Sequence, residues 1–116
     1  MLKLLFLDYR ELETVKGFER RLEQPVKCPQ NPLLIADQPW ENGNMTFYGS
    51  VVKAPGKPFQ CWYTCIHKPW HMVLCYAESD DGIVWRRPLM DLVKHKGKKT
   101  NIVFDLEPHG AAIIHD

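Results

Sequence analysis

Ser79-Asp80-Asp81-Gly82-Ile83-Val84-Trp85 forms a tight-turn motif that closes a run of short apolar segments. Glycine accepts positive φ without a Cβ clash, so an Asp-Gly step between apolar residues predicts a turn between strands. The serine and aspartate side chains of such a turn can hydrogen-bond its backbone. We expect Trp85, three residues after the glycine, to fold back over the turn. The motif therefore indicates an all-β architecture more strongly than any activity.

Short apolar segments precede and follow this turn at regular intervals. Each connecting segment is about four residues long and carries proline or the Asp-Gly step. That length suits antiparallel hairpins, because a parallel crossover needs a dozen residues or more. Four consecutive antiparallel strands would form a meander, a sheet of the size of one β-propeller blade. The expected strands are 45–54, 59–66, 71–78 and 83–87.

The N-terminal third of the chain carries a weaker pattern. We interpret residues 4–12 and 17–25 as further strands, with a helix over 9–22 as the alternative. Gly17 and two β-branched residues inside that range weaken the helical interpretation. The segment 25–44 contains four prolines and several Asn and Gly residues, so it is predicted to be largely irregular loop.

The C-terminal part predicts a connector and two more strands. The connector covers 88–100, and the strands cover 101–105 and 111–114. We therefore expect an all-β chain in which an antiparallel four-stranded meander, a propeller blade, is flanked by additional strands. The expected divisions are N-terminal strands and a Pro-rich loop at 1–44, a first blade at 45–87, and a connector with the first strand of a second blade at 88–116.

The charge balance of the chain gives no sign of a strongly charged partner. The 116 residues include 15 Lys and Arg against 14 Asp and Glu, so the net charge of +1 gives no reason to expect nucleic acid or an anionic membrane. The basic run 94–99 is interpreted as a solvated loop.

No segment approaches the about 18 apolar residues needed to span a bilayer. Residues 1–7 superficially resemble a signal peptide, but the apolar run is short and lacks a cleavage site, so a strand is the better interpretation. Localisation stays open between an intracellular protein and one whose leader has been removed.

The cysteines leave three interpretations open. Three of them fall within 61–75 together with two histidines, in the order Cys61-x3-Cys65-x-His67-x3-His71-x3-Cys75. This order offers five zinc ligands, but it lacks the C-x2-C spacing of most structural zinc sites. A disulfide between Cys75 and Cys61 or Cys65 is the second interpretation. The third, which we favour, treats the cysteines as small apolar residues on one face of a strand.

Several blocks, taken in order and spacing, resemble a known family. They are Leu5-Phe6-Leu7-Asp8-Tyr9, Asn31-Pro32-Leu33-Leu34, Asp37-Gln38-Pro39-Trp40-Glu41, Tyr48-Gly49-Ser50-Val51, Phe59-Gln60-Cys61-Trp62-Tyr63, Cys75-Tyr76-Ala77-Glu78 with the turn motif, and Asn101-Ile102-Val103. The chain resembles the N-terminal part of bacterial glycoside-hydrolase-like five-bladed β-propellers, which are related in fold to arabinanases, levansucrases and invertases. The resemblance covers nearly the whole chain. Because members of that family are several times longer and often act on extracellular glycans, it implies a fragment or truncated product of a carbohydrate-active protein.

The resemblance also implies where a site would lie. In such propellers, carboxylates from different blades line the channel, because one must protonate the leaving oxygen while another attacks or activates water. The loop before the first strand offers Asp37 and Glu41 as catalytic carboxylates and Trp40 as a sugar-stacking ring, and the C-terminal part offers His109 for substrate and Asp116 for catalysis. We expect no cofactor and no metal.

Each of these residues also has a structural interpretation. Asp37 would cap a turn, Glu41 would be a solvated loop charge, and Trp40 would anchor the loop on the sheet. His109 would be a turn residue before a glycine, and Asp116 a frayed terminus. A single blade cannot supply the full set of carboxylates, so we expect the chain to be inactive alone.

A different class of function competes with the enzyme fragment. A lone meander buries one face and leaves both edges open, so copies of the chain could pair edge to edge as a homo-oligomeric binding or assembly module. The sequence leaves the choice between these two functions open.

Overall fold

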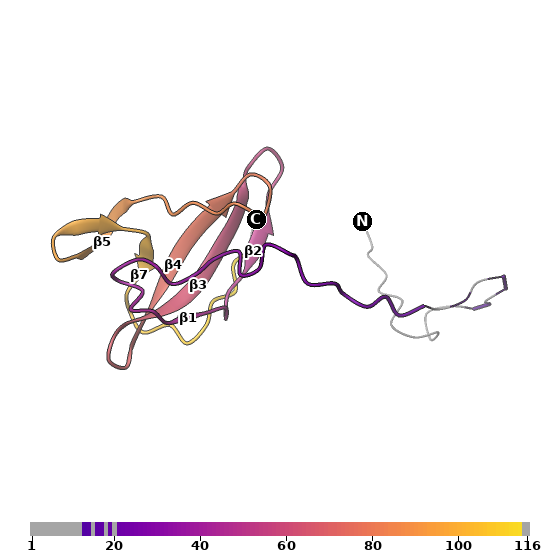
Figure 1. Ribbon diagram of the computed structural model, residues 1–116, viewed down its shortest axis with the longest axis horizontal. Helices are drawn as coiled ribbons and strands as arrows, with labels where there is room; N and C mark the ends of the chain where they lie inside the picture. The colour runs from indigo at the N-terminus through magenta and orange to yellow at the C-terminus, as the bar shows by residue number, and fades with distance from the viewer. Residues whose placement is uncertain (1–12, 15, 18, 20, 115–116) are drawn as a thin grey trace.

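The computed structural model describes residues 13–14, 16–17, 19 and 21–114, and the regular elements within them are all β-strands (Figure 1). This confirms the all-β prediction. No helix long and apolar enough to cross a membrane occurs in this part of the chain. The strands are β1 (Met45–Thr46), β2 (Val51–Lys53), β3 (Phe59–Lys68), β4 (His71–Ser79), β5 (Met90–His95), β6 (Lys98–Thr100) and β7 (Ile102–Phe104).

One antiparallel sheet is built around the long β3–β4 hairpin. Both β1 and β2 pair with β3, and β7 pairs with the other side of β4. The hairpin register runs from Phe59 opposite Ser79 to Lys68 opposite His71, with an irregularity near its closed end. The sheet order is therefore β1 and β2, β3, β4, β7, and every pairing is antiparallel. The predicted succession of hairpins holds as far as β4, whereas β7 joins the sheet only after β5 and β6.

The predicted strand at 45–54 is interrupted at Gly49. Here the backbone passes so close to β3 that a Cβ on Gly49 would lie 1.8 Å from the carbonyl oxygen of Trp62. The Trp62 amide donates to the Ser50 carbonyl at 3.0 Å just beyond this point. Only glycine fits such an approach, and the strand divides into β1 and β2 on either side of it.

The predicted turn chemistry at Ser79 to Trp85 is confirmed. Gly82 has a φ of 78°, and its amide donates to the Ser79 hydroxyl at 2.8 Å. The Asp81 carboxylate accepts from the amides of Ile83 and Val84, each at 2.8 Å. The indole N–H of Trp85 donates to the Gly82 carbonyl at 3.2 Å, so the ring does fold back over the turn.

The strand predicted at 83–87 is wrong. The backbone amides of Ile83 and Val84 donate to the Asp81 carboxylate, so they cannot form hydrogen bonds with a neighbouring strand. The segment pairs with β4 only through one bridge, between Arg86 and Glu78. The fourth strand of the sheet is instead β7, which places Ile102 opposite Cys75. Residues 102–104 thus belong to the same sheet and not to a following blade, and the predicted boundary at residue 87 does not match the sheet.

The connector predicted at 88–100 contains a second, two-stranded sheet. Strands β5 and β6 form a hairpin whose turn is Lys96 and Gly97, both with positive φ. The basic run lies at this exposed tip, as a solvated segment would. The hairpin projects beside β7 (Figure 1) and contributes the half-buried Val93 to the core.

The core lies on one face of the main sheet. It is formed by buried side chains that alternate along β3 and β4, together with Ile102 of β7, and it is covered by Trp40 from the Pro-rich loop. The members from the two central strands are Cys61, Tyr63, Cys65, Val73, Cys75 and Ala77. A loop without regular structure therefore supplies the second layer over the sheet.

The remaining segments are irregular where they are described. The loop at 25–44 contains turns but no strand or helix, as predicted. No strand or helix forms within 17–25 among its described positions, and 4–12 lies outside the described residues. The strand predicted at 111–114 is wrong. That segment runs along the junction of β1 and β2, where the Ala111 amide donates to the Tyr48 carbonyl at 2.8 Å.

Candidate functional site

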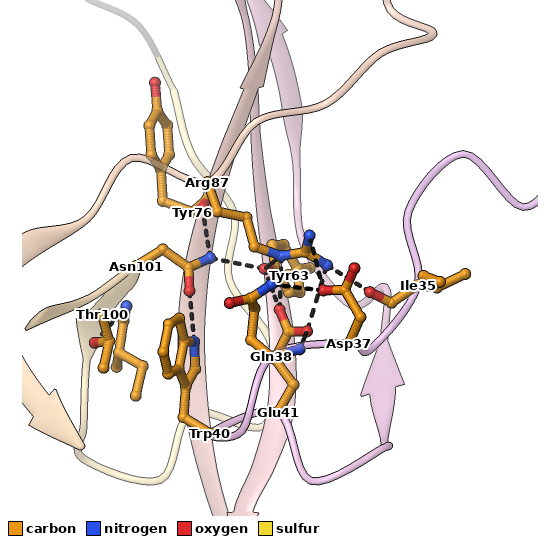
Figure 2. A network of polar contacts seen from close by, with 11 residues as sticks. Ile35, Asp37, Gln38, Trp40, Glu41, Tyr63, Tyr76, Arg87, Thr100 and Asn101 are labelled. Atoms are coloured by element: carbon orange, nitrogen blue, oxygen red, sulfur yellow. Dashed lines mark hydrogen bonds and ion pairs between the residues drawn. The ribbon is translucent and has the colours of Figure 1, made fainter. Parts of the chain in front are cut away.

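A buried carboxylate organises the interior between the Pro-rich loop and the sheet (Figure 2). Glu41 has no exposed surface. Its Oε1 accepts a hydrogen bond from the Tyr63 hydroxyl at 2.6 Å and from Arg87 Nε at 2.9 Å. Its Oε2 accepts from the Gln38 amide at 3.0 Å and from Arg87 Nη2 at 3.3 Å. Both carboxylate oxygens are therefore paired within the protein.

Arg87 connects this carboxylate to the loop that covers it. The guanidinium is 11% exposed, lies 3.3 Å from an oxygen of Asp37, and donates to the carbonyl of Ile35. Burial would lower the pKa of Arg87, but its contacts with Tyr63, Glu41 and Asp37 outweigh burial and raise it. One cation thus ties two loop carboxylates to the segment after the Asp-Gly turn.

The network continues through the core to β7. Asn101 Nδ2 donates to the Tyr63 hydroxyl and to the Tyr76 carbonyl, each at 2.7 Å, and Asn101 Oδ1 accepts from the indole of Trp40 at 2.6 Å. Burial and the Glu41 carboxylate raise the pKa of Tyr63, which keeps the phenol protonated as a donor. We call Glu41, Arg87, Tyr63, Asn101 and Trp40 the Glu41 network.

The Glu41 network has a structural role. Across the described residues, no buried side-chain nitrogen or oxygen lacks a hydrogen-bond partner. A satisfied, solvent-free carboxylate has no lone pair left for a substrate, and a fully paired network stabilises and specifies the core that contains it. In this arrangement Glu41 positions Tyr63 and Arg87.

The proposed site residues lie in different environments. Asp37 and Glu41 are brought together by Arg87, but only Asp37 reaches solvent, with 49% of its side chain exposed. Trp40 is 7% exposed and anchors the loop on the sheet, so its ring is not open to a sugar. His109 is exposed in the C-terminal segment, and Asp116 lies outside the described residues.

A second polar cluster lies at the closed end of the β3–β4 hairpin. His71 Nε2 contacts the Asp105 carboxylate, and His71 Nδ1 lies 3.1 Å from Glu107 Oε1. The ring of His67 lies edge-on to His71 at 6.5 Å and to His95 of β5 at 5.1 Å between ring centroids. We call this end of the sheet the histidine end.

The histidine end also holds the loop that carries Asp37. His67 Nδ1 lies 3.1 Å from the Trp40 carbonyl, and the ring of Trp40 lies 6.4 Å from that of His95. The Pro-rich loop, the β3–β4 turn and the tip of the β5–β6 hairpin therefore meet at one end of the sheet. Loops gathered on a rigid sheet are where binding residues are usually carried.

The histidines of this end differ in their electrostatic surroundings. Hydrogen bonds that the His71 imidazole donates to Asp105 and Glu107 raise the pKa of His71, since both carboxylates favour the imidazolium. Burial, followed by the neighbouring His67, Lys96 and Lys68, lowers the pKa of His95.

The cysteines take the apolar role that we favoured. Cys61, Cys65 and Cys75 are free thiols buried in the core, and Cys28 is a partly exposed thiol in the loop. Burial raises the pKa of Cys61 to about 11. Among the residues described, no group of three or more His, Cys, Asp or Glu side chains is arranged to hold a metal ion. The described residues therefore show no arrangement of ligands that supports the zinc interpretation, because the thiols face the core and His71 contacts two carboxylates.

Comparison with protein-family models, curated proteins and solved structures gives no match for this chain.

Sequence reasoning missed the partners that complete both clusters. Tyr63, Arg87 and Asn101 lie far from Glu41 in sequence, and no spacing rule links them to it. Asp105 and Glu107 were likewise not linked to His71. The available signal was polarity within predicted strands: Tyr63, Arg87, Asn101 and Asp105 lie inside 59–66, 83–87 and 101–105. A polar side chain that a strand buries needs a hydrogen-bond partner.

Proposed function

We propose that this chain supplies one blade of a carbohydrate-active β-propeller and does not hydrolyse glycosides by itself. The observation that carries the proposal is the four-stranded antiparallel sheet of β1 and β2, β3, β4 and β7, with the Asp-Gly turn and its folded-back tryptophan directly after β4. Propeller blades are antiparallel sheets of four strands.

The expected inactivity follows from the carboxylates. Glycosidic cleavage needs two carboxyl groups that flank the bond, at about 5 Å in retaining enzymes and at about 6.5–9.5 Å in inverting enzymes. Of the two loop carboxylates, Asp37 is half-exposed, whereas Glu41 is fully buried and paired. Only Asp37 is therefore open to a substrate, and one carboxylate cannot fill both roles.

The proposal is tested with the full chain in two measurements. In the first, a panel of aryl glycosides should release no aryl alcohol above a blank, and robust turnover would overturn the inactivity. In the second, gluco-, galacto-, manno-, xylo- and arabino-trisaccharides should shift amide NMR signals in residues 35–38, and Asp37→Asn should weaken these shifts. Unchanged spectra in that loop with every trisaccharide would contradict a carbohydrate-facing role for it.

A second candidate function is self-assembly. An apolar hollow of about 480 Å³ lies between the Pro-rich loop and the sheet, and Phe47 and Val51 at its lining are half-exposed. Exposed apolar surface of this kind favours association with another surface. The solution mass of the chain distinguishes this candidate, because association would raise it above the mass of one chain as concentration increases.

A further inference from the structure

Trp70 is the most exposed large apolar side chain among the described residues, at 94%. It lies in the two-residue turn between β3 and β4 with a φ of 64°, a region that L residues other than Asn and Asp rarely adopt. Glycine would serve this turn with less strain, and a polar residue would expose less apolar surface. Folding therefore gives no reason for a tryptophan here.

Polar side chains that could bind hydroxyl groups lie at the same end of the sheet as the turn that carries this tryptophan. Trp70 directly precedes His71, whose imidazole is 26% exposed and contacts Asp105 and Glu107. These two carboxylates are 34% and 62% exposed. The closed end of the β3–β4 hairpin thus carries an exposed indole in its turn, and it carries an imidazole with two carboxylates that solvent can reach at the adjoining strand ends.

The cluster is carried by paired strands. His71 opens β4, and Asp105 directly follows β7, which pairs with β4 through Leu74 and Phe104. The contact of His71 with Asp105 joins the two strands at the same end. A site whose residues are held by a sheet and by each other binds with little loss of conformational freedom.

The charge of the cluster restricts its ligand. Two carboxylates face one imidazole, so an anion such as a phosphate would be repelled. A sugar ring presents an apolar C–H face to an aromatic ring, and the hydroxyl groups at its edge can donate hydrogen bonds to carboxylates. Tryptophan supplies that flat surface with few rotatable bonds to immobilise.

We propose that Trp70, His71, Asp105 and Glu107 form a saccharide-binding subsite, in which the indole stacks on a neutral sugar ring, Asp105 and Glu107 accept hydrogen bonds from its hydroxyls, and His71 holds the two carboxylates in position. The proposal deepens the proposed function, on which it rests, by naming a second carbohydrate contact, at the histidine end of the sheet. It involves no catalytic step.

The test is a titration of the isotope-labelled full chain with the same five trisaccharides, monitored at the Trp70 indole N–H and at the amides of His71, Asp105 and Glu107. We expect these signals to shift together and to saturate with at least one trisaccharide. Trp70→Gly should weaken binding about tenfold, since it removes the stacking surface. The same variant should be at least as stable as the parent because it relieves the positive φ, so lost binding cannot reflect unfolding.

Two variants complete the test. Trp70→Phe keeps a flat ring and should retain binding, and Leu106→Ala removes a neighbouring exposed apolar side chain and should leave binding unchanged. Shifts confined to residues 35–38 would overturn the Trp70 subsite while leaving the proposed function standing. Shifts confined to Trp70 and its neighbours would support the subsite and remove the role of the Asp37 loop. Unchanged spectra throughout, or full binding by Trp70→Gly, would overturn the subsite.

Discussion

The buried Glu41 carboxylate forms an ion pair with Arg87, and this pair affects the free energy of unfolding. Replacing the carboxylate by an amide in Glu41→Gln leaves the guanidinium of Arg87, which is 11% exposed, without its buried counter-charge. Breaking a buried pair by removing one partner costs about 3–5 kcal/mol. We expect Glu41→Gln to lower the free energy of unfolding by about 3 kcal/mol in urea denaturation.

The matched control is Asp37→Asn, which alters the other carboxylate on the same guanidinium. Its side chain is 49% exposed and its contact is longer, at 3.3 Å, so its removal should cost less than about 1 kcal/mol. Equal effects of the two variants would contradict the structural role assigned to Glu41.

The titration of two histidines should separate by environment. Because Asp105 and Glu107 raise the pKa of His71, its imidazole should titrate above 6.5, whereas His95 should titrate below 6.5. NMR titration of the ring protons measures both in one sample, and Asp105→Asn should lower the His71 value. A His71 midpoint below that of His95 would contradict the assigned contacts.

The same pairing contributes a pH dependence of stability. The folded pKa of His71 lies above the unfolded value, so the folded state binds the proton more tightly. The contribution of this group is fully present below the ordinary pKa of 6.5 and is lost as the pH rises through the higher folded pKa. Asp105→Asn should therefore reduce stability more at pH 5 than at pH 9.

At the scale of elements, the passage of the chain at Gly49 requires a residue without a side chain. In Gly49→Ala the new Cβ would lie 1.8 Å from the Trp62 carbonyl oxygen, which is backbone and cannot rotate away. We expect a loss of about 3 kcal/mol or more in the free energy of unfolding, at the upper end of overpacking costs.

Gly56→Ala provides the comparison for this variant. Gly56 has a φ of 70° with no atom near the added Cβ, so its substitution should cost only the left-handed strain of about 1–2 kcal/mol. If Gly56→Ala were the more damaging change in thermal or urea unfolding, close approach would not be the reason for Gly49.

The elements that could be predicted from sequence are those fixed by local patterns. The alternation in 59–66 and 71–78 and the Asp-Gly turn are set by neighbouring residues, and the structure has them. The strand expected at 83–87 failed because the Asp81 carboxylate takes the amides that a ladder would need. The hairpin within 88–100 was missed because its charged strands show little apolar alternation.

The site was less accessible to sequence reasoning than the fold. Asp37, Trp40 and Glu41 were singled out from one loop, but their exposure depends on Arg87, Tyr63 and Asn101, which approach only in the folded sheet. Burial is a property of the three-dimensional arrangement, so a candidate catalytic carboxylate and a core carboxylate look the same in sequence.

For the molecule as a whole, the sheet ends at β7, and Phe104 on this strand is 44% exposed. Strands at a sheet edge pair readily with a second chain. We expect light scattering to give an average mass that rises above one chain as concentration increases, and Phe104→Lys to reduce the rise. Leu92→Lys places the same charge on the exposed β5 and should leave the rise unchanged. A constant single-chain mass would contradict edge pairing and the assembly function.

The rate at which the three core cysteines react with an alkylating reagent reports how often the sheet opens. Only a thiolate attacks an alkylating reagent, and Cys61, Cys65 and Cys75 are inaccessible while β3 and β4 remain packed. Cys28 is partly exposed and serves as the internal reference for the reagent. The interval between the first and the later alkylations therefore measures how often the packing of β3 and β4 opens, without a probe being introduced.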